Sequence, residues 1–114
     1  MKTPRLLISI LITVQVLLAG CSEPVEPPKD VVAQPTPGEL VYRKTCKVCH
    51  AQSINGAPIP GNAKMWAPRA AQGIDVLLQH ASEGYGLMPA KGGNAALTEA
   101  EIRSAIEYML SKLP

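Results

Sequence analysis

The stretch Cys46–His50, with the sequence CKVCH, is the most informative part of this 114-residue chain. In a helix its two thiols lie about one turn apart, and His50 directly follows the second. Cys-x-x-Cys-His is the attachment pattern for a c-type haem: Cys46 and Cys49 add to the two vinyl groups, and the histidine becomes the proximal iron ligand. The stretch therefore predicts one covalently attached haem c.

Three other interpretations of this stretch are weaker. A thioredoxin-like dithiol needs a β-α-β setting, whereas the surrounding pattern is helical. A zinc site needs two further ligands, and outside the motif the chain has only His80 and Cys21 as His or Cys. A chance match is disfavoured by the helical context and by the export signal that precedes the motif.

Residues 1–20 have the features of an export signal. Lys2 and Arg5 precede a mostly apolar run over residues 6–18. That run is shorter than the roughly 20 residues needed to span a membrane and fits the apolar core of a signal, about 7–15 residues. We expect this segment to be removed on export.

The sequence LAGC at Leu18–Cys21 resembles the lipobox of bacterial lipoprotein precursors. The similarity implies cleavage before Cys21 and acylation of its thiol and new amine; ordinary cleavage nearby, leaving a spare thiol, is the alternative. An odd cysteine in an exported chain needs a use, and more than one acyl chain gives a stable anchor. Ser22 after that cysteine favours the outer membrane in this family. We expect a lipid-anchored protein on the periplasmic side of a bacterial membrane.

Composition divides the remaining chain into a tether and a domain. Residues 21–38 form a lipidated cysteine followed by a segment with five prolines, which cannot bury a core, and residues 39–114 form the folded domain. A proline-rich tether of this length reaches roughly 50 Å at about 3.1 Å per residue. The net charge of +2 belongs to the signal, since removing Lys2 and Arg5 leaves nine basic and nine acidic residues. A neutral chain gives no support for nucleic-acid binding.

The domain has helical patterns and no strand alternation of useful length. A capping box at Thr36–Glu39 starts a helix that runs into the haem motif, and a second at Thr98–Glu101 starts one that reaches about Lys112. Asn62 caps a short helix through Trp66, which ends before Pro68. A further helix covers residues 74–83. A domain of under about 80 residues without a disulfide needs a staple, and a haem would supply it.

Four side chains are candidates for the second axial ligand: Met65, Met88, Met109 and His80. Met109 lies on the apolar stripe of the last helix, and Met65 stands beside Trp66, so both are expected to be packing residues. His80 falls off the apolar face of its helix and is expected to face solvent. Met88 stands in a loop rich in Gly and Pro, which can bring backbone close to a flat ring. A gap-filling methionine is the alternative for this position.

From Gly38 onward the chain resembles class I cytochromes c, most of all the bacterial cytochrome c-five group. The resemblance implies an all-α fold of three to five helices around one haem, with Gly38 letting the first and last helices approach closely at Ala105 and Tyr108. The matching stretches are the run Gly38-x3-Tyr42-x3-Cys46-x2-Cys49-His50, then Gly56–Pro58, Trp66–Arg69, Gln72–Gly73, Gly86–Pro89 and Gly92–Gly93.

The resemblance also implies roles for single residues. The Pro58 carbonyl accepts a hydrogen bond from His50 Nδ1, and Met88 is the sixth iron ligand. Apart from the resemblance, we expect Arg69 and Trp66 as candidates for bonding the haem propionates, with simple packing the alternative for Trp66, and we place Tyr42 in the surroundings of the haem. The group's usual cysteine pair after the methionine loop is missing, since residues 94–97 read NAAL.

A site closed by His50 and Met88 leaves no iron position for a substrate. We therefore expect a monomeric one-electron carrier between redox proteins of a respiratory chain, and not an enzyme. A peroxidase-like enzyme or a sensor of nitric oxide or carbon monoxide is the alternative, and both require Met88 to leave the iron. Segments 54–60 and 86–90 are expected to frame the haem edge. The lysines that could steer acidic partners, or simply be solvated surface, are Lys47, Lys64 and Lys91.

Overall fold

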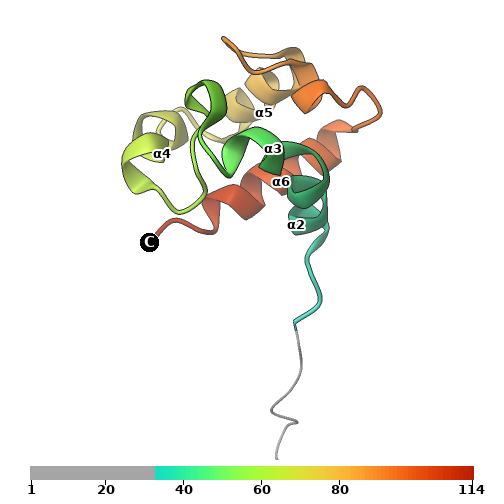
Figure 1. Cartoon of the computed structure of the whole chain (residues 1–114), viewed down its shortest axis with the longest axis horizontal. Helices are drawn as coiled ribbons and strands as arrows, with labels where there is room; N and C mark the ends of the chain where they lie inside the picture. Colours follow the sequence, from blue (N-terminus) through green and yellow to red (C-terminus); the bar gives the residue numbers. More distant parts are fainter. Residues whose placement is uncertain (1–32) are drawn as a thin grey trace, which may run out of the picture. The chain divides into compact units, whose positions relative to one another are not determined.

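The computed structural model describes residues 33–114, and these form helices and turns without a β-strand (Figure 1). The expected all-α class is confirmed. The predicted signal, Cys21 and most of the tether lie outside the described residues. In chain order the elements are α2 (Pro37–Val41), η2 (Tyr42–Cys46), α3 (Lys47–His50), η3 (Ile54–Gly56), α4 (Ala63–Ala70), α5 (Ile74–Glu83), η4 (Ala90–Gly93) and α6 (Glu99–Leu110).

The first helical stretch carries the haem motif at its end. It begins at Pro37, two residues before the predicted domain boundary, and the Glu39 N–H donates to Thr36 Oγ1 at 3.1 Å, as in a capping box. The Glu39 carboxylate, however, pairs with Arg43 at 2.6 Å instead of returning to the Thr36 backbone. The stretch continues through the π-helical turn η2 into α3, which ends at His50. Such wider turns are frequent at functional sites.

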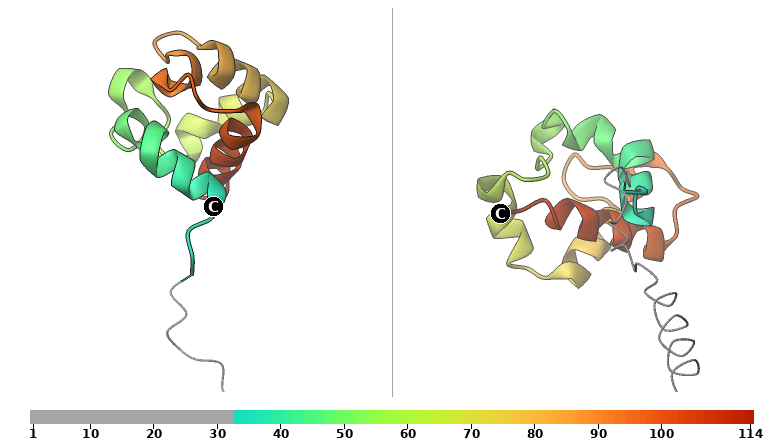
Figure 2. Two further views of the ribbon diagram at one scale, coloured as in Figure 1. Left: turned by 90° about the vertical axis from the view of Figure 1, so that its right-hand side faces the viewer. Right: turned by 90° about the horizontal axis from the view of Figure 1, so that it is seen from below.

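Gly38 marks the crossing of α2 and α6, which Figure 2 (left) shows as the teal and red helices lying against each other. A Cβ added to Gly38 would lie 2.1 Å from the Ser104 carbonyl oxygen and 3.3 Å from the Ala105 nitrogen. Only glycine therefore allows this approach, and Ala105, 1% exposed, is a suitably small partner. The close contact expected between the first and last helices is present.

Helix α4 is longer than the sequence predicted. Asn62 caps it as expected, with its side-chain oxygen accepting from the Met65 N–H at 3.2 Å, but the helix passes through Pro68 and ends at Ala70. A proline ring disrupts the carbonyls of the preceding turn. The carbonyl that Pro68 leaves without an intrahelical donor is that of Lys64, four residues earlier, and Lys64 is exposed, where water can bond a free carbonyl. The Arg69 guanidinium donates to the neighbouring Met65 carbonyl at 2.5 Å. The expectation that the helix ends before Pro68 was wrong, because only one backbone bond is lost and it lies at an exposed residue.

Helices α5 and α6 follow the sequence pattern closely. Helix α5 has the predicted bounds and ends at Gly84, whose φ of 91° favours glycine. The Thr98 capping box is complete, and α6 ends at Leu110, after which tighter backbone bonds cover the turn to Leu113. No helix within residues 33–114 is long and apolar enough to cross a membrane. The buried cluster that joins these helices consists of Tyr42, Trp66, Leu77, Ala81, Leu97, Ile102, Ile106 and Met109.

Candidate functional site

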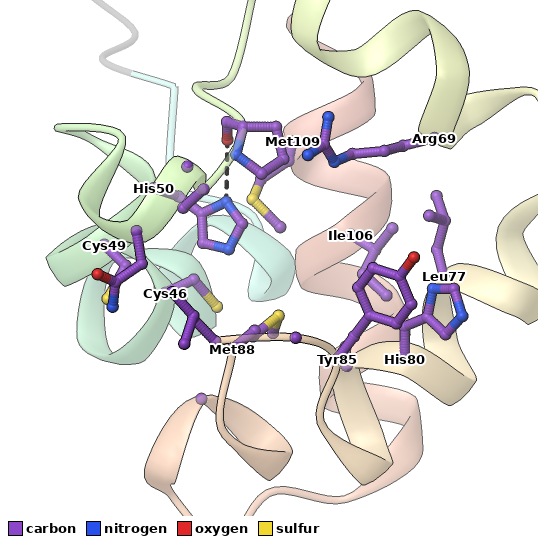
Figure 3. Close-up of a pocket in the computed structure, with 18 of the residues that line it drawn as sticks. Cys46, Cys49, His50, Arg69, Leu77, His80, Tyr85, Met88, Ile106 and Met109 are labelled. Atoms are coloured by element: carbon purple, nitrogen blue, oxygen red, sulfur yellow. Dashed lines mark hydrogen bonds between the residues drawn. The ribbon is translucent and has the colours of Figure 1, made fainter.

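An apolar pocket of about 490 Å³ lies between the haem motif, helices α4, α5 and α6, and the Met88 loop (Figure 3). This volume is within the roughly 300–1,000 Å³ typical of cofactor and ligand sites. The residues on its wall that the sequence pointed to are Cys46, Cys49, His50, Pro58, Trp66, Arg69, Met88 and Met109. Side chains distant in the sequence thus converge on one space.

His50 is held at the end of α3 with its ring directed into the pocket. It is 7% exposed, and its Nδ1 lies 2.9 Å from the Pro58 carbonyl oxygen, the hydrogen bond that the resemblance implied. Because a carbonyl can only accept, Nδ1 carries the proton and Nε2 is left with its lone pair. Burial lowers the pKa of His50, and the Arg69 charge adds to this against the opposing Pro58 bond. The lowered pKa favours the neutral ring, the form that binds a metal.

The two cysteines enter the pocket wall from η2 and α3. Burial raises the pKa of the Cys46 thiol, which disfavours the thiolate. A redox-active dithiol requires the opposite, a thiol of lowered pKa. The helical setting also lacks the β-α-β unit of thioredoxin-like sites, and within residues 33–114 no three His, Cys, Asp or Glu side chains gather as a metal site requires.

Met88 is presented to the pocket by a tight two-residue hairpin. The Tyr85 N–H donates to the Met88 carbonyl at 3.0 Å, and the Met88 N–H donates to the Tyr85 carbonyl at 2.9 Å. Gly86, the first of the two turn residues, has a φ of 58°, the conformation for which such turns use glycine. The Met88 side chain extends into the pocket, on the wall below the His50 ring in Figure 3. The loop therefore places a thioether in the same pocket as the imidazole.

The other candidate ligands have different positions. Met109 is 4% exposed and belongs to the buried cluster, although it also touches the pocket, and Met65 does not line the pocket. His80 was expected to face solvent, and this was wrong: it is half-buried, lines the pocket and stacks on Tyr85 with ring centroids 4.0 Å apart. Its place three residues after buried Leu77 could have indicated the pocket side of α5.

The three residues predicted to surround the haem, Arg69, Trp66 and Tyr42, have different contacts. Arg69 lines the pocket and, beyond its bond to the Met65 carbonyl, keeps other guanidinium donors. Trp66 is 3% exposed, and its single N–H donates to the Ile59 carbonyl at 2.9 Å, which favours the packing role. Tyr42 is not on the pocket wall; it is buried against Tyr108, with ring centroids 5.3 Å apart.

Together these residues fit a covalently bound haem. Two thiols one helical turn apart stand beside an oriented imidazole, a thioether lines the same pocket, and the pocket wall is mostly apolar. This donor set and the helical fold define a small protein built around a single haem c.

Residues 33–109 match the family described as cytochrome c oxidase, cbb3-type, subunit III. The chain is 43% identical over 79 residues to cytochrome c-555 of Chlorobaculum tepidum, an alignment that covers 66% of this chain and 73% of the relative. It is 37% identical over 71 residues to cytochrome c5 of Ectopseudomonas mendocina, covering 60% and 82%.

Two solved structures of small cytochromes c resemble this chain in both fold and sequence. A cytochrome c crystallised in an electron transfer complex with nitrite reductase has a TM-score of 0.64 and 44% identity, and the match covers 70% of this chain and 98% of that one. Cytochrome c551 of Ectothiorhodospira halophila has a TM-score of 0.58 and 38% identity, with 67% and 99% covered. The chain belongs to the cytochrome c family, among its small mono-haem class I members, and its cofactor is one covalently bound haem c.

Proposed function

We propose that this protein is a one-electron carrier with a closed haem site, in which Cys46 and Cys49 hold the haem and His50 and Met88 are the axial iron ligands. The observation that carries the proposal is the convergence of an oriented imidazole and a thioether on one apolar pocket. Relatives that are electron-carrier cytochromes support it. When bound, haem c supplies a reversible one-electron change at iron.

The residues of this chain keep the site unchanged during that exchange. The Pro58 carbonyl fixes the tautomer and orientation of His50, so that its Nε2 stays directed into the pocket. The Tyr85–Met88 hairpin holds the thioether in place through two backbone bonds. Apolar walls exclude water, and a thioether ligand together with burial favours the reduced iron.

The exposed rim of the pocket supports docking of redox proteins. Ile54, Tyr85 and Leu87 line the pocket and are 41%, 61% and 73% exposed, respectively. A small apolar rim suits brief encounters. We infer that donor and acceptor, redox proteins of a respiratory chain, meet the protein here; a related cytochrome c forms an electron transfer complex with nitrite reductase. Difference spectra of native membranes with each candidate donor would identify the donor; failure of every respiratory donor to reduce the protein would contradict this assignment.

A peroxidase-like enzyme or a gas sensor remains the second candidate because His80 and Tyr85 place polar groups on the pocket wall. Either function requires an open iron position. The stacking of His80 on Tyr85 and the two hydrogen bonds that hold Met88 favour the closed carrier.

The ligand assignment is tested by Met88→Ala in the haem-loaded protein. We expect the weak red sulfur-to-iron charge-transfer band of the ferric protein to disappear and the reduced protein to bind carbon monoxide rapidly. Met65→Ala is the matched control, because Met65 does not line the pocket, and it should change neither property. A charge-transfer band that survives in Met88→Ala would mean that another residue is the ligand.

We further propose that the mature protein is exported, anchored through acylated Cys21 on the periplasmic side of a membrane, with the outer membrane favoured, and tethered by the proline-rich segment 21–38. The lipobox-like sequence and the composition of that segment support this. Cys21→Ser should move the haem protein from the membrane to the soluble fraction. Continued membrane association of this variant, with its haem spectrum intact, would contradict lipidation.

A further inference from the structure

Lys91, three residues after Met88, turns its side chain back toward the chain that follows. Its Nζ donates to the Leu97 carbonyl at 2.8 Å and to the Ala95 carbonyl at 3.4 Å. Lys91 is half-buried, so it is not the free steering charge that the sequence suggested. Its backbone has a φ of 55°, a conformation that few non-glycine residues adopt, and Gly92 continues the turn with a φ of 61°.

The acceptor of the shorter bond, the Leu97 carbonyl, belongs to a buried residue at the start of α6. Leu97 is 9% exposed and belongs to the same buried cluster as Ile102. The two residues flank the N-cap Thr98 in the arrangement called a hydrophobic staple. The intrahelical bonds of α6 begin with the Ile102 N–H donating to the Thr98 carbonyl at 3.0 Å, so the Leu97 carbonyl lies outside them. Lys91 supplies a donor to this leftover carbonyl.

The other polar contacts of the segment after Met88 are local or weak. The Gly92 N–H donates to the Pro89 carbonyl at 3.0 Å and the Asn94 N–H to the Lys91 carbonyl at 3.1 Å, which shape the turn without fixing it to the core. The Asn94 side chain reaches Thr45 Oγ1 only at 3.5 Å, the outer limit of a hydrogen bond. A charged donor gives a stronger bond than a neutral one. The Leu97 N–H also donates to the Asn94 carbonyl at 3.1 Å, but this bond is neutral, so among the described residues Lys91 gives the one charged link from this segment to the start of α6.

We propose that Lys91 is a positioning residue for Met88, whose loop it ties to the stapled start of helix α6. The proposal rests on Met88 being the axial ligand. The hairpin fixes the loop before Met88, and the lysine fixes it three residues after, so the thioether is held from both sides. Release of the tie would raise the fraction of molecules in which Met88 has left the iron.

The test uses the haem-loaded protein and the rate at which its reduced form binds carbon monoxide, which reports how often Met88 leaves. Lys91→Met keeps an unbranched apolar stem and removes the donors, and Lys91→Arg keeps donors. The matched control is Lys64→Met, at an exposed lysine of α4 whose side chain makes no hydrogen bond within residues 33–114. We expect roughly tenfold faster binding in Lys91→Met, equivalent to about 1.4 kcal/mol. Lys91→Arg and Lys64→Met should stay within about twofold of the unmodified protein.

Two results would overturn the proposal: a Lys91→Met rate within about twofold of the unmodified protein, or an equal acceleration in Lys64→Met, which would indicate a general charge effect. If Lys91→Met does not accumulate, Lys91→Gln, with a shorter neutral donor, should give an intermediate acceleration, and an unchanged rate would again overturn the tie. Met88→Ala separates the two proposals. If it does not accelerate binding, the ligand assignment fails; if it does and Lys91→Met does not, only the tie fails.

Discussion

Replacing Gly38 with alanine should destabilise the domain, although alanine is the better helix former. Intrinsic propensity alone predicts that Gly→Ala within a helix stabilises by up to about 1 kcal/mol. At Gly38, however, the new Cβ would lie 2.1 Å from the Ser104 carbonyl oxygen and 2.6 Å from its carbon, against an ordinary contact of at least 3.4 Å. The two helices would have to separate by about 1.3 Å, the difference between 3.4 and 2.1 Å.

The loss of stability in Gly38→Ala is estimated from the packing that is lost when α2 and α6 move apart. A gap of about 0.5–1 Å already forfeits a quarter to a half of the dispersion attraction across an interface. Overpacking costs about 1–3 kcal/mol, and a clash with backbone, which cannot rotate away, belongs at the upper end. We expect a loss of about 3 kcal/mol, which for a domain of this size lowers the melting temperature by roughly 12–24 °C.

The assay is thermal and guanidinium unfolding of the haem-loaded protein followed by far-ultraviolet circular dichroism. Ala100→Gly, at an exposed position of α6, gives the Gly/Ala propensity difference in this protein without a clash, at a cost of up to about 1 kcal/mol. A Gly38→Ala protein as stable as the unmodified one, or more stable, would refute the close crossing of α2 and α6.

Two further predictions concern the packing and capping of single residues. Trp66→Phe leaves the Ile59 carbonyl without its indole donor and opens a small gap in the core. The free energy of unfolding, measured by guanidinium titration, should therefore fall by about 2 kcal/mol. An unchanged free energy of unfolding would contradict the buried hydrogen bond. Hydrogen bonds from the backbone N–H and then the hydroxyl of Thr98 hold the pKa of Glu101 below its usual 4.5. The ionised carboxylate therefore stabilises the fold above that pH. This stabilisation is lost as the pH falls through the lowered pKa of the folded protein. The difference in melting temperature between the unmodified protein and Glu101→Gln should therefore shrink in acid, and a difference independent of pH would speak against the capping box.

Local patterns in the sequence predicted the elements whose signals are local. The bounds of α5 follow from the spacing of its apolar residues between two glycines, and Thr98 and Glu101 identify the start of α6. Pro68 misled because the carbonyl that it leaves without a donor belongs to Lys64, which is exposed, so the helix continues to Ala70 at the loss of one backbone bond. The exposure of such a carbonyl depends on how the helix packs, which the local sequence does not give.

The haem motif predicted Cys46, Cys49 and His50, and the family resemblance predicted Pro58 and Met88. Pro58 bonds His50 as the resemblance implied, and Met88 lines the same pocket, but neither spacing nor composition alone would have brought these residues together. The positions that sequence reasoning missed depend on long-range or unusual backbone geometry: His80 is turned into the pocket, and Lys91 adopts a left-handed conformation that is rare for lysine.

Whether the haem site is closed by His50 and Met88 is decided by the spin state of the ferric protein. Electron paramagnetic resonance of the isolated, haem-loaded protein should show low-spin iron with the signature of histidine and methionine ligands, accompanied by the red sulfur-to-iron charge-transfer band. A high-spin ferric spectrum at neutral pH would contradict the account, because it would mean that Met88 leaves the iron open.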